Sequence, residues 1–215
     1  MVITMVEVLK DVYSMDHSEA KDHSRETWLL NCKEGVVVID AGMKPDAVER
    51  ITSELSSFGK GWKDVKLVLI THKHGDHVKN LPRVKELTSA PIEAHKLEAP
   101  LIEKAMGVKV EGLEDGEVLP FCGGIEVIHI PGHSEGNACY YLPKKSAMIA
   151  GDTVFGDAEG NLMAPPERYC LDVKQATKGI RRLLDYDFDT LLYTHGKDVM
   201  KDAKKRVAEL VEKTR

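Results

Sequence analysis

Five of the nine histidines and two of the aspartates in this 215-residue chain form one spaced set of potential metal ligands. A dense loop comes first, Thr71-His72-Lys73-His74-Gly75-Asp76-His77, and three motifs follow it: Pro131-Gly132-His133-Ser134, Gly151-Asp152-Thr153 and Thr194-His195-Gly196. Neutral imidazole and carboxylate groups hold zinc and related divalent metals. Seven such groups are too many for one tetrahedral ion, but they suit two ions that share a bridging carboxylate and a bridging water. The set therefore predicts metal-assisted hydrolysis and says much less about the substrate.

Each of the four motifs begins where an apolar, strand-like run of the sequence stops. The four runs are Val65–Ile70, Ile125–Ile130, Ala147–Ala150 and Thr190–Tyr193. Strands that end on one rim of a sheet core can point the following side chains into a shared cleft, because rigid strands fix the positions from which the loops converge. We therefore expect the seven groups to lie together.

The remaining sequence alternates between strand-like and helical patterns. We expect further strands over Val6–Tyr13, Thr27–Cys32, Val36–Asp40, Ile92–Ala94 and Ala138–Leu142. We expect helices from Pro45 to about Phe58 and over Leu81–Leu87, Leu97–Met106, Asp172–Leu184 and Lys201–Lys213, with Asp172 as an N-cap. No repeat or linker interrupts this pattern, so we expect a single domain that spans residues 1–215.

Composition makes several classes of function less favoured. Hydrophobic residues make up 42% of the chain and charged residues 30%, which is ordinary for a folded domain. The net charge is −5 and no basic run stands out, so a nucleic-acid surface is not favoured. No stretch approaches the ~20 apolar residues that a membrane-spanning helix needs, so we expect no membrane span. The oligomeric state is left open.

The four cysteines give a further expectation about the compartment. They contain no CxxC pair, and Cys32 and Cys139 lie in apolar runs typical of core positions. We therefore expect no disulfide framework and a reducing compartment. The N-terminus also lacks the long apolar segment of a secretory signal, which favours a cytoplasmic location.

The HxHxDH loop, followed at fitting intervals by His133, Asp152 and His195, resembles the ligand pattern of the metallo-β-lactamase-fold hydrolase superfamily. The resemblance runs from about Val6 to the end of the chain. It implies an α/β (α+β) fold, a four-layer αββα sandwich of two mixed β-sheets flanked by helices.

The resemblance also implies roles for individual residues. By position, one metal would be held by His72, His74 and His133, the other by Asp76, His77 and His195, and Asp152 would bridge both. Asp40, at the end of Val36–Asp40, matches an aspartate that orients the ligand loop, although a helix N-cap or an ordinary turn residue after a strand is the alternative. Two divalent ions would lower the pKa of a shared water, so that hydroxide is available near neutrality. Zinc is the favoured metal, and iron and manganese are the alternatives. Asp76 would be catalytic, orienting that hydroxide and passing a proton to the leaving group.

Other residues receive weaker assignments. Phe155, Arg168 and Tyr169 are candidates for substrate binding, although a surface role is equally open. We expect His129 to be a core histidine, and we place His95, Ser134 and Cys170 outside the chemistry. His17 and His23 lie in a loop between two strands, where solvent contact is favoured over substrate contact.

Departures from relatives favour a glyoxalase II-like branch of this superfamily. Asp152 stands where well-known zinc β-lactamases have a cysteine or no bridging ligand, and His74 where flavodiiron proteins carry a glutamate. Phe155 replaces a tyrosine of acyl-homoserine lactonases. The residues that follow His195 are enough for only one helix, so we do not expect the helical extension with which glyoxalase II binds glutathione.

Three classes of function therefore remain in view. The first is a dinuclear hydrolase of a small ester, thioester, lactone or phosphoester. The alternative is a single-iron, persulfide dioxygenase-like oxidoreductase, which uses part of the same ligand framework. A non-enzymatic binding module would be expected to lose ligands, and this chain has lost none.

Overall fold

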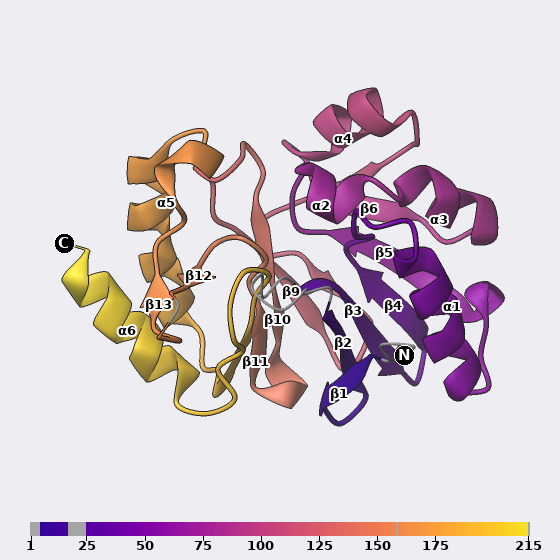
Figure 1. Ribbon diagram of the computed structural model, residues 1–215, viewed down its shortest axis with the longest axis horizontal. Coiled ribbons are helices and arrows are strands. Elements are labelled where there is room, and N and C mark those ends of the chain that lie inside the picture. Colours follow the sequence, from indigo (N-terminus) through magenta and orange to yellow (C-terminus); the bar gives the residue numbers. More distant parts are fainter. Residues whose placement is uncertain (1–4, 17–24, 158, 215) are drawn as a thin grey trace.

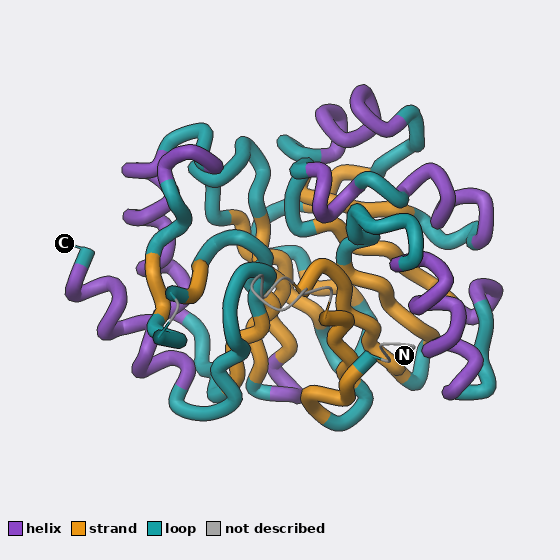
Figure 2. Tube along the Cα trace, viewed as in Figure 1, coloured by secondary structure: helices purple, strands orange, loops and turns teal. Residues whose placement is uncertain are grey.

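Two mixed β-sheets lie face to face in the middle of the computed structural model, and helices cover both outer sides (Figure 1). The structure describes residues 5–16, 25–157 and 159–214. Figure 2 shows the same layers by type, with strands gathered centrally and helices at the two flanks. The predicted αββα sandwich is thus confirmed.

The first sheet contains seven strands whose spatial order follows the chain. They are β1 (Val6–Leu9), β2 (Val12–Asp16), β3 (Arg25–Cys32), β4 (Gly35–Ile39), β5 (Val65–Ile70), β6 (Ile92–His95) and β7 (Glu111–Leu113). Strands β1 to β4 pair antiparallel, whereas β4 to β7 pair parallel. Parallel neighbours need crossover connections. These are supplied by α1 (Ala47–Ser57), the 3-10 turn η1 (Trp62–Asp64), α2 (Gly75–Val78), α3 (Leu81–Leu87) and α4 (Ala99–Met106).

The second sheet has five strands in the order β14-β11-β10-β9-β8, and only its β11–β14 pair is parallel. The strands are β8 (Val118–Leu119), β9 (Ile125–His129), β10 (Ala138–Leu142), β11 (Ala147–Ile149) and β14 (Thr190–Leu192). The helical elements on its outer side are α5 (Val173–Gly179), the 3-10 segment η4 (Ile180–Asp185) and α6 (Ala203–Lys213). Between β11 and α5 lie the short hairpin β12 (Phe155–Gly156) and β13 (Leu162–Met163) and the turn η3 (Glu167–Tyr169), while η2 (Pro143–Lys145) joins β10 to β11.

Alternation along the strands divides the interior into three apolar layers. In β4, Val36 and Val38 pack toward the helices, whereas Val37 and Ile39 pack toward the second sheet. In β11, Met148 packs toward the helices on the opposite flank. Successive side chains of a strand point to opposite faces, so a continuous apolar run is what a strand covered on both faces requires.

Two element predictions differ from the structure. The run Val6–Tyr13 forms two strands instead of one, because the chain reverses at Lys10 and Asp11, where Asp11 adopts a left-handed φ of 62°. The expected helix over Asp172–Leu184 is α-helical only to Gly179 and continues as the tighter η4. Its start is as predicted, since the Asp172 carboxylate accepts a 2.9 Å hydrogen bond from the backbone of Gln175.

The expectation of unpaired cysteines is wrong for Cys32 and Cys122, which form a disulfide. These residues lie 90 positions apart in the sequence, and no short spacing signals the pair. Stacking of the sheets brings the end of β3 beside the turn between β8 and β9, with the two Cα atoms 4.8 Å apart. Cys139 is a buried free cysteine, as predicted. Among the described residues, none of the helices combines the length and the apolar character needed to cross a membrane.

Candidate metal centre

The candidate ligands come from loops that follow strands of both sheets. Strand β5 of the first sheet ends at Ile70, directly before the HxHxDH loop, and α2 begins inside that loop at Gly75. In the second sheet, β9 leads into the His133 loop, β11 into Asp152 and β14 into His195. The predicted placement of the motifs after strands is therefore what the structure has, and the loops of two different sheets meet over one site.

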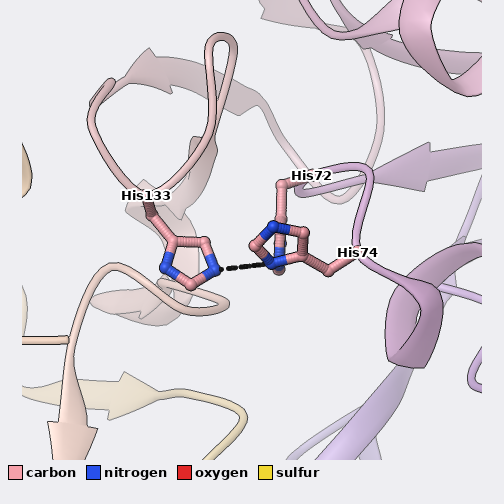
Figure 3. A group of neighbouring side chains, drawn as sticks. All are labelled: His72, His74 and His133. Atoms are coloured by element: carbon pink, nitrogen blue, oxygen red, sulfur yellow. Dashed lines mark hydrogen bonds between the residues drawn. The ribbon is translucent and has the colours of Figure 1, made fainter. Parts of the chain in front are cut away.

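His72, His74 and His133 form the first group that could hold a metal ion (Figure 3). The His72 Nε2 atom lies 3.1 Å from His74 Nδ1 and 3.2 Å from His133 Nε2, and the last two atoms are 2.9 Å apart. Three nitrogens that face one another in a triangle are poorly satisfied by hydrogen bonds, since a neutral imidazole has a single donor. Nitrogens bound to zinc at about 2.0–2.1 Å lie about 3.3–3.4 Å apart in a tetrahedron, so this triangle fits a cation.

Two further groups adjoin the first and share Asp152: His72, His77 and Asp152, and Asp76, Asp152 and His195. The His195 Nε2 atom lies 3.3 Å from Asp76 Oδ2 and 3.4 Å from Asp152 Oδ2. His77 Nε2 and Asp152 Oδ1 are 3.4 Å apart, and both are buried without a hydrogen-bond partner. Buried polar atoms are rarely left unpaired. A divalent cation between these atoms would satisfy both, so the residues present fit a second ion.

Asp40 lies directly beneath the HxHxDH loop and is fully buried. Its carboxylate accepts hydrogen bonds from the Thr71 backbone and hydroxyl, each at 2.8 Å, and lies 2.7 Å from His77 Nδ1. A carboxylate accepts only, so Nδ1 of His77 carries a proton toward Asp40, and in the neutral ring that binds a metal the lone pair of Nε2 faces Asp152. Asp40 adopts a φ of 60°, which aspartate tolerates better than most side chains.

Electrostatics divide the histidines into two sets. Burial lowers the pKa of His133 to about 4 and also lowers those of His72 and His74, so all three stay neutral and able to bind a metal. Burial acts in the same direction on His195, but hydrogen bonds and charge from Asp152 and Asp76 outweigh it and raise the pKa of His195 to about 10. The pKa of His77 is likewise raised, because nearby carboxylates overcome its burial.

The site opens into a cavity of about 690 Å³ whose lining includes His74, Asp76, Asp152 and His195. The three residues assigned to substrate binding, Phe155, Arg168 and Tyr169, also line this cavity. The Phe155 ring stacks near His195, with centroids 4.9 Å apart, and lies parallel to Tyr169 at 6.3 Å. The Arg168 guanidinium lies 4.7 Å above the Tyr169 ring. The lining of the cavity therefore includes aromatic side chains and a positively charged guanidinium group.

Sequence reasoning missed Met43, an exposed residue that also lines the cavity. It follows Asp40 in the loop after β4, and the sequence near it carries no signal of a cleft residue.

Among the described residues, the two histidines outside the spaced set, His95 and His129, do not join the three groups. His129 and His95 stack on each other with centroids 3.8 Å apart, and His129 Nε2 lies 3.0 Å from the Glu135 carbonyl. His129 is half-buried, so it is less enclosed than the predicted core histidine. His17 and His23 fall outside the described residues. Cys170 is closer to the centre than expected, with its sulfur 3.8 Å from His133 Nδ1.

The αββα sandwich and the convergent histidines and aspartates define a metal-binding hydrolase fold. The chain belongs to the metallo-beta-lactamase superfamily, whose family model matches residues 22–196. A hydroxyacylglutathione hydrolase of Rhizobium meliloti is 35% identical over 121 residues, which cover 54% of this chain and 41% of that protein. The probable metallo-hydrolase YflN of Bacillus subtilis is 26% identical over 74% of this chain and 75% of its own length. This chain spans less than half the length of the first hydroxyacylglutathione hydrolases that it matches.

Solved structures agree with this fold. The metallo-beta-lactamase from Pontibacter korlensis superposes with a TM-score of 0.79 over 97% of this chain and 98% of its own, at 21% sequence identity. At that identity the similarity supports the fold, and the chemistry has to be argued from the site.

Proposed function

We propose that this protein is a dinuclear metal-dependent hydrolase that acts on a small ester, thioester, lactone or phosphoester. The observation that carries the proposal is the convergence of seven imidazole and carboxylate groups in three adjoining clusters. Four of these residues line one cavity: His74, Asp76, Asp152 and His195. In this proposal His72, His74 and His133 would hold one ion, Asp76, His77 and His195 would hold the other, and Asp152 would be a ligand shared by both. Zinc suits this mixture of ligands, and iron and manganese remain the alternatives.

Two divalent ions held there would lower the pKa of a shared water and polarise a carbonyl or phosphoryl oxygen. The residues of the chain supply the rest of the chemistry. Asp76 lines the cavity and is partly accessible, so its carboxylate can orient the attacking oxygen and then carry a proton toward the leaving group. Phe155 and Tyr169 offer apolar surface to the substrate, and Arg168 offers a positive charge.

The choice of substrate class draws support from the relatives. These relatives are named as hydrolases of hydroxyacylglutathione, an acyl compound, and the hydrolysis of an acyl carbonyl needs an activated water. A cavity of about 690 Å³ suits a small molecule.

The test combines metal analysis with a substrate panel. Protein purified without added metal should bind close to two metal ions per chain. It should hydrolyse at least one member of a panel that contains an ester, a short acyl thioester, a lactoylglutathione-type thioester, a lactone and a phosphodiester. Removing the metal with a chelator should abolish this activity, and restoring it should recover the activity. A single iron, with no second ion bound after addition of zinc or manganese, would instead favour the persulfide dioxygenase alternative.

The cytoplasmic location remains a prediction from the sequence. The disulfide between Cys32 and Cys122 bears against it, because structural disulfides are uncommon in reducing compartments outside certain thermophiles. Quantifying free thiols in protein extracted from the producing cells under acid quench would decide whether this pair is oxidised in its own compartment.

A further inference from the structure

Glu98 is a fully buried carboxylate outside the seven candidate ligands. It is the N-cap residue of α4, but its carboxylate makes no hydrogen bond to the first turn of that helix. Burying a carboxylate is costly unless hydrogen bonds compensate it, so the partners of this side chain indicate what the arrangement supports.

Both carboxylate oxygens of Glu98 accept hydrogen bonds from the ligand loops. Oε1 accepts from the Lys73 backbone N–H at 2.7 Å, and Oε2 accepts from the Gly136 backbone N–H at 2.6 Å. Lys73 lies between His72 and His74 in one loop, and Gly136 lies three residues after His133 in the other. A Cβ atom on Gly136 would come within 2.5 Å of the Glu98 backbone nitrogen, so glycine permits this close approach.

The two loops that Glu98 joins arise from different sheets. The His72 and His74 rings follow β5 of the first sheet, and the His133 ring follows β9 of the second. Their three facing nitrogens lie within 3.2 Å of one another, a spacing that depends on how closely the loops are held. The ion pair between Lys73 and Glu135 also joins these loops, but both partners are partly exposed, and such pairs are weak.

We propose that Glu98 is a positioning residue that fixes the distance between the His72–His74 loop and the His133 loop, and so shapes the three-histidine metal site. Asp40 supports the other part of the centre through His77, so each part has its own buried carboxylate. This inference rests on the proposed metal site. Hydrogen bonds to an ionised acceptor are roughly twice as strong as neutral ones, which suits a clamp between two loops.

The test is the zinc affinity of Glu98→Gln, measured by competition with a chromophoric chelator, with Glu135→Gln as the matched control. Glutamine keeps the volume of the side chain but presents an N–H group to one of the two backbone donors. Glu98→Gln should lower the affinity for one of the two zinc ions by about 10- to 100-fold, as expected when a residue that supports a metal ligand is lost. The affinity for the second ion should change by less than about threefold, and Glu135→Gln should leave both affinities unchanged. Cobalt substitution, read by visible absorption, should assign the weakened ion to the site with three nitrogen ligands.

Equal losses of affinity for both ions in Glu98→Gln would indicate general destabilisation and would overturn the positioning role. Unchanged affinities in Glu98→Gln, with wild-type protein binding two zinc ions, would overturn this inference and leave the proposed function intact. Wild-type protein that binds no metal would overturn both.

A measurement on the wild-type protein covers the case in which Glu98→Gln fails to fold. In the metal-free protein, the amide protons of Lys73 and Gly136 should resonate downfield and exchange slowly with solvent in NMR spectra. Fast exchange at both amides would overturn the proposal.

Discussion

Replacing Asp40 by asparagine should weaken one metal site while leaving the fold in place. Asparagine has nearly the same volume and is among the residues that best tolerate the left-handed φ of 60° at this position. The change removes one acceptor oxygen from a buried carboxylate that faces Thr71 and His77. If the side-chain oxygen of the new asparagine keeps its hydrogen bond from the Thr71 backbone N–H, its NH₂ group faces the His77 ring. The His77 Nδ1 atom must then accept a hydrogen bond from that NH₂ group.

The consequence reaches the metal site through the tautomer of His77. If Nδ1 accepts a hydrogen bond, a neutral imidazole carries its proton on Nε2, the atom that faces Asp152 at 3.4 Å. Binding a cation at Nε2 then requires the proton to move to Nδ1. There the Nδ1–H group faces the asparagine NH₂ group, so two buried donors point at each other without an acceptor. An unsatisfied buried donor costs about 1–3 kcal/mol, or roughly 5- to 150-fold in affinity. The loss should fall on the ion next to His77.

Zinc titration of Asp40→Asn by calorimetry with a competing chelator measures this change, and circular dichroism checks the fold. Asp115→Asn is the matched control, because Asp115 also accepts a backbone hydrogen bond, from His129, but lies outside the three ligand groups. Wild-type affinity for both ions in a folded Asp40→Asn protein would refute the reasoning. Equal losses in Asp115→Asn would refute it as well.

Three further outcomes are expected. Asp76→Ala should lose most hydrolysis with its circular dichroism spectrum unchanged, and wild-type turnover would contradict its catalytic role. His129→Gln should keep the full metal content, since the ring contacts His95 and the Glu135 carbonyl instead of the centre, and loss of one metal equivalent in elemental analysis would show the ligand assignment to be wrong. The pKa of His195, raised to about 10 by Asp152 and Asp76 against its burial, contributes stability to the metal-free protein that is complete below about pH 6.5. Thermal melts of metal-free protein should therefore show a falling Tm as pH rises from 7 to 10, and a flat profile there would contradict the ion pairs.

Much of the fold was predictable because the relevant signals are local. The run Val65–Ile70 could be assigned as a buried strand from its apolar residues alone, and the structure has β5 over those same residues. Asp172 could be assigned as an N-cap from its residue type and place. The αββα arrangement came from the resemblance that the ligand motifs carry.

Other features depend on contacts that no local pattern encodes. The hairpin at Asp11 replaces a single strand because one residue adopts a left-handed conformation. The disulfide between Cys32 and Cys122 exists because stacked sheets bring together residues that are distant in the sequence. Glu98 resembles any acidic residue at the start of a helix until its two acceptor oxygens are seen to meet two loops.

The sequence by itself determined the chemical identity of the candidate centre, because imidazole and carboxylate groups and their intervals along the chain are written in the order of residues. Only the tertiary structure decided their distances. The three histidine nitrogens of Figure 3 come from loops of two sheets and meet within 3.2 Å. Such a spacing is set by the packing of the sheets against each other and by buried hydrogen bonds between the loops, and both exist only after the chain has folded.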